Sequence, residues 1–60
     1  MSVLMSTFED NNRTAYVYLE KNKYKLVLKE NDNIKISYHT YQQQAEDMGE
    51  DWVLKANLGD

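Results

Sequence analysis

The segment that decides the fold is TAYVYLEKNKYKLVLKENDNIKISYH, residues 14–39. Apolar and polar residues alternate across 34–39, and Tyr24, Leu26 and Leu28 alternate with Lys25, Val27 and Lys29. This period of two is typical of strands. Residues 14–19 are rich in the β-branched and aromatic side chains that favour strands. The polar links at 20–23 and 31–33 contain asparagine, which tolerates the backbone of tight turns. The segment therefore predicts a three-stranded antiparallel meander.

From Thr40 onward the pattern changes to a helical period. Apolar side chains recur there at intervals of three and four residues, which places them on one stripe of a helix. The stripe contains Tyr41, Ala45, Met48, Trp52, Val53 and Ala56. Thr40 and Gln43 have the spacing of a capping box, and Asn57 and Gly59 supply a C-terminal stop. Gly49 lies in the middle of this helix, where we expect it to allow close contact with the sheet.

Residues 1–13 have two interpretations. The alternation of Val3, Met5 and Thr7 with their neighbours fits a fourth strand, and a frayed terminus is the other interpretation. The expected architecture is α+β in either case. Residues 14–60 form a single βββα domain, with the C-terminal helix packed on one face of the sheet.

Alternation also assigns the two faces of the predicted sheet. The inward set, which meets the helix, comprises Ala15, Val17, Leu19, Leu26, Leu28, Ile34, Ile36 and Tyr38. The outward set comprises Tyr16, Tyr18, Lys25, Val27, Lys29, Lys35, Ser37 and His39. A shift of one residue in the strand at 14–19 would bury its tyrosines instead. The outer face is therefore expected to be both aromatic and basic.

Length and composition limit the possible functions. A chain of 60 residues forms one domain, and a core of that size supplies only about 3–5 kcal/mol. With no cysteine and one histidine, the chain offers no disulfide and no thiolate or histidine-rich metal site. No apolar run approaches a membrane span and the first residues do not resemble a signal peptide, so we expect a cytoplasmic protein. We expect no cofactor and no small-molecule substrate.

The net charge of −3 is unevenly distributed. Residues 13–39 sum to +3 and residues 40–60 to −4, so a basic sheet precedes an acidic helix. An uncovered aromatic face on so small a domain favours a protein-interaction or regulatory module that binds another protein and forms a homodimer. The alternative is a single-stranded nucleic-acid binder, in which tyrosines stack on bases and lysines contact phosphates. The negative net charge argues against that alternative.

The candidate contact residues form two groups. The group on the sheet face consists of Tyr16, Tyr18, Lys25, Val27, Lys29, Lys35 and His39. The acidic group on the helix consists of Glu46, Asp47, Glu50 and Asp51. The acidic group is either a docking face for a basic partner or a solvated surface, and Asp51 and Lys55 are spaced for an ion pair. We do not expect an enzyme, because Ser37 near His39 has no glycine-rich loop to complete an active site.

The whole chain resembles the small uncharacterised proteins encoded by bacteriophage genomes. The likeness lies in the short length, the tyrosine-rich meander and the final helix with YQQQAED at 41–47 and EDWV at 50–53. The resemblance implies an accessory protein that acts on a host protein in the host-cell cytoplasm. It identifies no individual functional residue.

Overall fold

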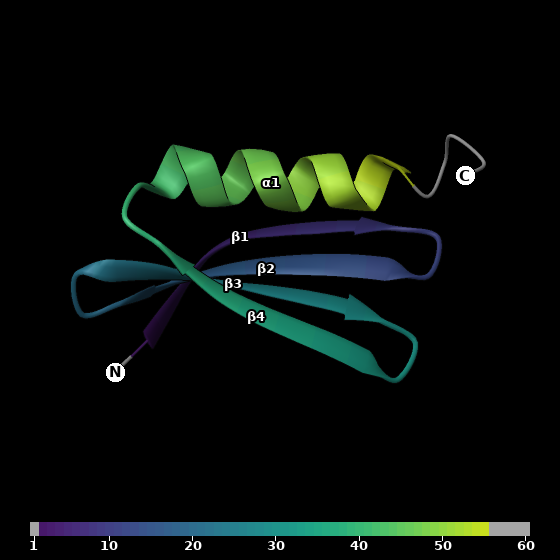
Figure 1. The fold of residues 1–60 in the computed structure, drawn as a ribbon, viewed down its shortest axis with the longest axis horizontal. Coiled ribbons are helices and arrows are strands. Elements are labelled where there is room, and N and C mark those ends of the chain that lie inside the picture. Colours follow the sequence, from purple (N-terminus) through teal and green to yellow (C-terminus); the bar gives the residue numbers. More distant parts are fainter. Residues whose placement is uncertain (1, 56–60) are drawn as a thin grey trace.

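The computed structural model describes residues 2–55, which form one sheet and one helix. The strands are β1 (Ser2–Asp10), β2 (Arg13–Glu20), β3 (Lys23–Glu30) and β4 (Asn33–His39), and the helix is α1 (Gln42–Lys55). All neighbouring strands are antiparallel, and they follow one another across the sheet in sequence order. Figure 1 shows α1 along one face, over β1, β2 and β3 more than over β4. The predicted α+β architecture is confirmed, and the N-terminal segment forms a fourth strand.

Two-residue turns join the strands at 11–12, 21–22 and 31–32, which gives the meander a period of ten residues. The first residue of each turn has a positive φ: 53° at Asn11, 58° at Lys21 and 55° at Asn31. Hairpins of this length favour such turns because their twist matches that of the flanking strands. Asparagine tolerates this backbone, whereas a left-handed conformation costs most other residues about 1–2 kcal/mol. Lys21 is therefore the strained position among the three.

Turn length fixes which side chains face α1. Val17 lies beside Leu26, and Leu26 lies beside Ser37, so these three residues share the face that the helix covers. Tyr16 and Tyr18 consequently lie on the opposite side of the sheet, which we call the open face. The predicted orientation of β2 and β3 is confirmed.

The orientation of β4 is the reverse of the prediction. Ile34, Ile36 and Tyr38 are predicted to face inward, but they lie on the open face and are 58%, 53% and 54% exposed. The helix-facing side of β4 instead carries Lys35, Ser37 and His39. The sequence pattern assigns Asn33 to a three-residue turn, whereas Asn33 is the first residue of β4. A difference of one residue in the turn exchanges the two faces of the strand that follows.

A β-bulge interrupts β1. Its pairing with β2 shifts between Leu4 and Ser6, which leaves Met5 as the extra residue. Beyond the bulge, Ser6 and Phe8 face the helix, and Phe8 packs against the core. Leu4 lies before the bulge and stays on the open face, because it pairs with Tyr18.

The core lies between α1 and the centre of the sheet. Its enclosed side chains, each at most 2% exposed, are Ala15, Val17, Leu26, Ala45 and Val53. The partly buried side chains packed around them are Phe8, Tyr24, Leu28 and Trp52. The predicted burial of two residues of the helical stripe is wrong, because Tyr41 is 70% exposed and Met48 is 46% exposed. The core is therefore smaller than the sequence pattern predicts.

The N-terminus of α1 also differs from the prediction. The backbone N–H of Ala45 donates to the carbonyl of Tyr41 at 3.2 Å, which makes Tyr41 the N-cap residue. Thr40 therefore lies one residue before the position that a capping box requires. Ala56 of the predicted stripe and the predicted stop at Asn57 and Gly59 lie outside the described residues.

Gly49 allows α1 to approach the sheet closely, as predicted. A Cβ atom at this position would lie 3.1 Å from the Cβ of Ala15 and 3.1 Å from the Cδ1 of Leu26. Optimal carbon–carbon contacts are about 3.5–4.0 Å, so a larger residue would push the two layers apart.

Candidate interaction surface

The open face consists of three main rows of side chains that cross all four strands. The central row contains Thr7, Tyr16, Val27 and Ile36. One flanking row contains Leu4, Tyr18, Lys25 and Tyr38. The other flanking row contains Glu9, Thr14, Lys29 and Ile34. Apolar and aromatic side chains therefore extend from one edge of the sheet to the other, and patches of this kind mark interaction sites.

The two tyrosines of β2 form the aromatic centre of the open face. The ring centroids of Tyr16 and Tyr18 lie 6.2 Å apart, with an angle of 31° between the ring planes. Both residues are half-buried, as expected for side chains that have neighbours on the same face of a sheet. Together with Val27 they present a firm apolar surface on the two central strands.

The positive charge of the open face is smaller than the sequence suggests. Lys25, Lys29 and the two tyrosines lie there as predicted, but Lys35 and His39 lie on the helix-facing side. The Nζ atom of Lys25 lies 3.8 Å from a carboxylate oxygen of Glu20, so part of the remaining charge is compensated. Instead of these two cations, β4 contributes its apolar and aromatic residues to the open face.

The sequence pattern does not assign four apolar and aromatic residues of this surface to it: Leu4, Ile34, Ile36 and Tyr38. A signal for the residues of β4 is present in the sequence. Asn11-Asn12, Lys21-Asn22 and Asn31-Asp32 recur every ten residues, which indicates three turns of equal length. Equal two-residue turns would have placed Asn33 in the strand and the apolar residues of β4 on the open face.

The acidic group on α1 is partly engaged within the fold. Glu46 accepts hydrogen bonds from the Ser6 hydroxyl at 2.6 Å and from the Gln42 amide at 2.8 Å. The Ser6 bond, followed by the Gln42 bond, lowers the pKa of the Glu46 carboxyl, because both stabilise its charged form. The predicted pair of Asp51 and Lys55 is confirmed at 3.4 Å. These contacts give part of the acidic face a structural role.

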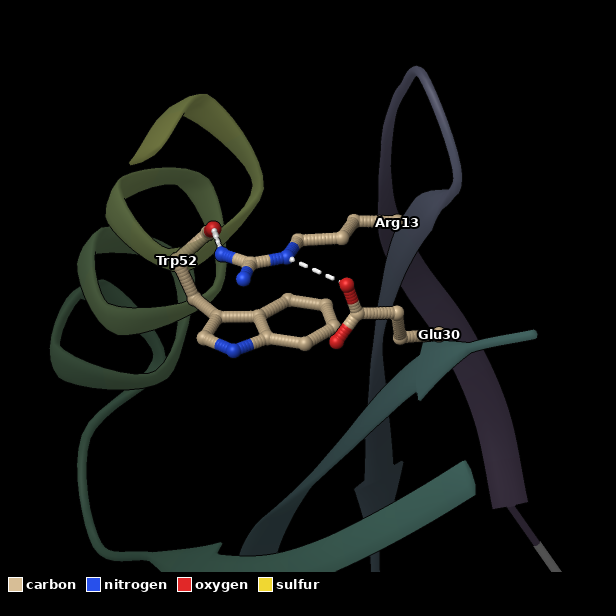
Figure 2. A network of polar contacts seen from close by, with 3 residues as sticks. All are labelled: Arg13, Glu30 and Trp52. Atoms are coloured by element: carbon tan, nitrogen blue, oxygen red, sulfur yellow. Dashed lines mark hydrogen bonds and ion pairs between the residues drawn. The ribbon is translucent and has the colours of Figure 1, made fainter. Parts of the chain in front are cut away.

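Arg13, which no sequence pattern marks, connects the end of α1 to the sheet. The guanidinium carbon of Arg13 lies 4.7 Å from the centroid of the Trp52 ring, within the range of a cation–π contact. Figure 2 shows the same guanidinium donating to the Trp52 carbonyl, at 2.8 Å, and to Glu30, at 3.2 Å. These contacts join β2 to α1 and β2 to β3, so the network fixes the helix over these two strands.

The helix-facing side of β4 brings Ser37 and His39 together. The Ser37 hydroxyl and the Nε2 atom of His39 lie 2.9 Å apart, because residues two positions apart on a strand share a face. Within residues 2–55, no three His, Cys, Asp or Glu side chains are grouped so that they could hold a metal ion. No helix in the described part of the chain is long and apolar enough to cross a membrane.

No family model, curated protein or solved structure matches this chain.

Proposed function

We propose that the protein is a non-enzymatic interaction module that binds another protein through the open face of its sheet. The observation that supports this proposal is the composition of the two central strands. Residues 15–19 and 26–28 are apolar or aromatic on both faces, although α1 covers only one of them. Strands that are apolar on both sides are typical of sheets with both faces covered.

The chemistry of the open face defines the partner. Its centre is apolar and aromatic, which favours a partner surface with an apolar centre. Lys23, Lys25 and Lys29 lie along β3, so acidic groups on the partner would complement this strand. Such charges steer the encounter, whereas burial of the apolar rows stabilises the complex.

Single-stranded nucleic acid is the second candidate. The neighbouring rings of Tyr16 and Tyr18 favour it, because each could stack on a base. The two faces of β4 argue against it, since Ile34 and Ile36 occupy the open face and Lys35 does not. Fluorescence anisotropy with labelled oligonucleotides at two salt concentrations separates the candidates. We expect no binding of the oligonucleotides. Salt-sensitive binding that Tyr18→Ala abolishes would favour nucleic acid over a protein as the partner.

A matched pair of variants tests the proposed protein contact. Ile36→Lys places a charge on the open face, and Leu54→Lys makes the same kind of change on α1 at a residue of similar exposure, 53% against 48%. Each variant and the wild type are tagged and captured from the source cell, and bound proteins are identified by mass spectrometry. We expect a stoichiometric partner, including an untagged copy of this chain, that Ile36→Lys loses and Leu54→Lys retains. Equal capture by both variants would contradict the use of the open face.

A further inference from the structure

The charges of the open face are separated by strand. Its lysines, Lys23, Lys25 and Lys29, all lie on β3. Its carboxylates lie on the same face but on the other two strands, Glu20 on β2 and Glu9 on β1. The outer strand β4 contributes only apolar and aromatic side chains to its part of the three rows. On this face the lysines of β3 therefore lie next to a strand, β2, that carries a carboxylate and no lysine.

This separation makes the open face complementary to itself in one arrangement. Two copies packed face to face are related by a two-fold axis that lies between the sheets. If the axis runs along the strands, between β2 and β3, then β2 of each copy lies opposite β3 of the other. If the axis runs across the strands, β3 lies opposite β3 and lysines meet lysines. Charge complementarity selects the first arrangement.

We propose that the protein that binds the open face is a second copy of this chain, with β2 of each copy opposite β3 of the other. The inference rests on the proposed function, because it names the partner of the same surface. An axis along the strands keeps each cross-strand row opposite itself. Glu20 then faces Lys23 of the other copy, and Tyr16 faces Val27 of the other copy. At the outer strands, Leu4 faces Tyr38 of the other copy.

The size of the face is sufficient for this contact. Four strands of about eight residues, spaced about 4.8 Å apart with a rise of about 3.4 Å per residue, present a projected area of about 500 Å². Two such faces together bury about 1,000 Å² or more, which reaches the lower limit for a specific protein interface. Packed sheets keep their strands within about 30° of each other, so the facing pairs near the centre are preserved. The association would also stabilise a domain with a small core by mass action.

The first experiment measures association of the purified protein. Sedimentation velocity across a dilution series gives the dimer dissociation constant of the wild type, Ile36→Lys and Leu54→Lys, with circular dichroism to verify that each is folded. We expect a wild-type dimer, a dissociation constant at least about tenfold higher for Ile36→Lys, and one within about twofold of wild type for Leu54→Lys. A wild type that stays monomeric at about 100 µM, a concentration that would populate any dimer of biological affinity, overturns the proposal. A dimer that Ile36→Lys leaves intact also overturns it.

The second experiment tests the pairing of β2 with β3. Glu20→Lys alone would place lysine opposite Lys23, and Lys23→Glu alone would place glutamate opposite Glu20, so each variant should dimerise more weakly than the wild type. An equimolar mixture restores opposite charges at both symmetry-related positions, and we expect heterodimers tighter than either homodimer. The ion pair of Glu20 with Lys25 lies within one chain, so its loss cannot produce preferential heterodimers. Mixtures no tighter than the separate variants would overturn this pairing.

The two proposals fail in different ways. A monomeric wild type that captures a different protein through Ile36 would overturn the second copy as partner and leave the proposed function standing. Absence of any Ile36-dependent contact, in the purified protein and in the cell, would overturn both.

Discussion

The two faces of the central strands have similar composition and different surroundings. On the helix-facing side, Val17 and Leu26 are fully buried, while their chain neighbours Tyr18 and Val27 on the open face remain half-exposed. The difference arises because one helix can cover only one side of a sheet. An apolar strand pattern thus indicates surfaces to be covered. In the described chain α1 covers one of the two faces, and the other is the surface that we propose for binding.

The largest expected effect is a loss of stability that differs between two adjacent residues of β3, Leu26 and Val27. Leu26→Ala leaves a cavity in the centre of the core and should lower the free energy of unfolding by about 2–5 kcal/mol, enough to unfold most of the protein. Val27→Ala shortens a side chain on the open face and should cost less than about 1 kcal/mol in the monomer. Urea denaturation at low protein concentration measures both. Equal losses would mean that the two faces do not differ in packing.

Trp52→Ala should have the next largest effect. The indole packs at the edge of the core and beneath the Arg13 guanidinium, so its removal should cost about 3 kcal/mol, the lower end of the range for large aromatic residues. Trp52→Phe keeps an aromatic ring in this position and should cost less. Thermal unfolding followed by circular dichroism compares the two variants, and wild-type behaviour of Trp52→Ala would contradict the observed packing of α1.

Gly49→Ala tests how closely the two layers approach. Alanine gains about 1 kcal/mol in helix propensity, but its methyl group would press against the Ala15 methyl, and overpacking typically costs about 1–3 kcal/mol. We expect a net destabilisation of about 1 kcal/mol in urea denaturation. Glu50→Ala, at the exposed next residue, should change stability by less than about 0.5 kcal/mol. A more stable Gly49→Ala variant would show that the layers separate easily.

Lys21→Asn should stabilise the hairpin that aligns β2 with β3. Asparagine tolerates the φ of 58° better than lysine, so we expect a gain of about 0.5–1 kcal/mol in the free energy of unfolding. The reverse change at the equivalent position, Asn11→Lys, should destabilise by a similar amount. If both changes act in the same direction, the turn backbone does not determine their effect.

The smallest expected effect concerns the contact of α1 with β1. The pKa of Glu46 is lowered in the folded state, so its hydrogen bond with Ser6 stabilises the fold above about pH 4.5 and is lost as the pH falls further. Ser6→Ala should therefore be less stable than the wild type at neutral pH, and the difference should shrink below pH 4.5. Urea denaturation at several pH values measures it. A constant difference across this range would assign the effect of Ser6 to packing.

The sequence predicts the elements well and the surface less well, for physical reasons. Alternation and asparagine-containing links identify the strands, and the inward positions of Ala15 and Leu26 follow directly. The faces of β4 depend on the length of a single turn, and assigning Asn33 to that turn reverses them. The contact of Arg13 with Trp52 joins residues 39 positions apart, and nothing in the local pattern of either residue predicts it.

The ten-residue spacing of the turns also bears on the order in which the chain folds. Each strand pairs with the next across only two residues, so every hairpin closes at low entropic cost, and isolated hairpins form in about 1–10 µs. The contact of Ser6 with Glu46 spans 40 positions and requires a much longer loop to close. The sheet should therefore assemble as a series of local hairpins, and docking of α1 onto β1 should be the last step.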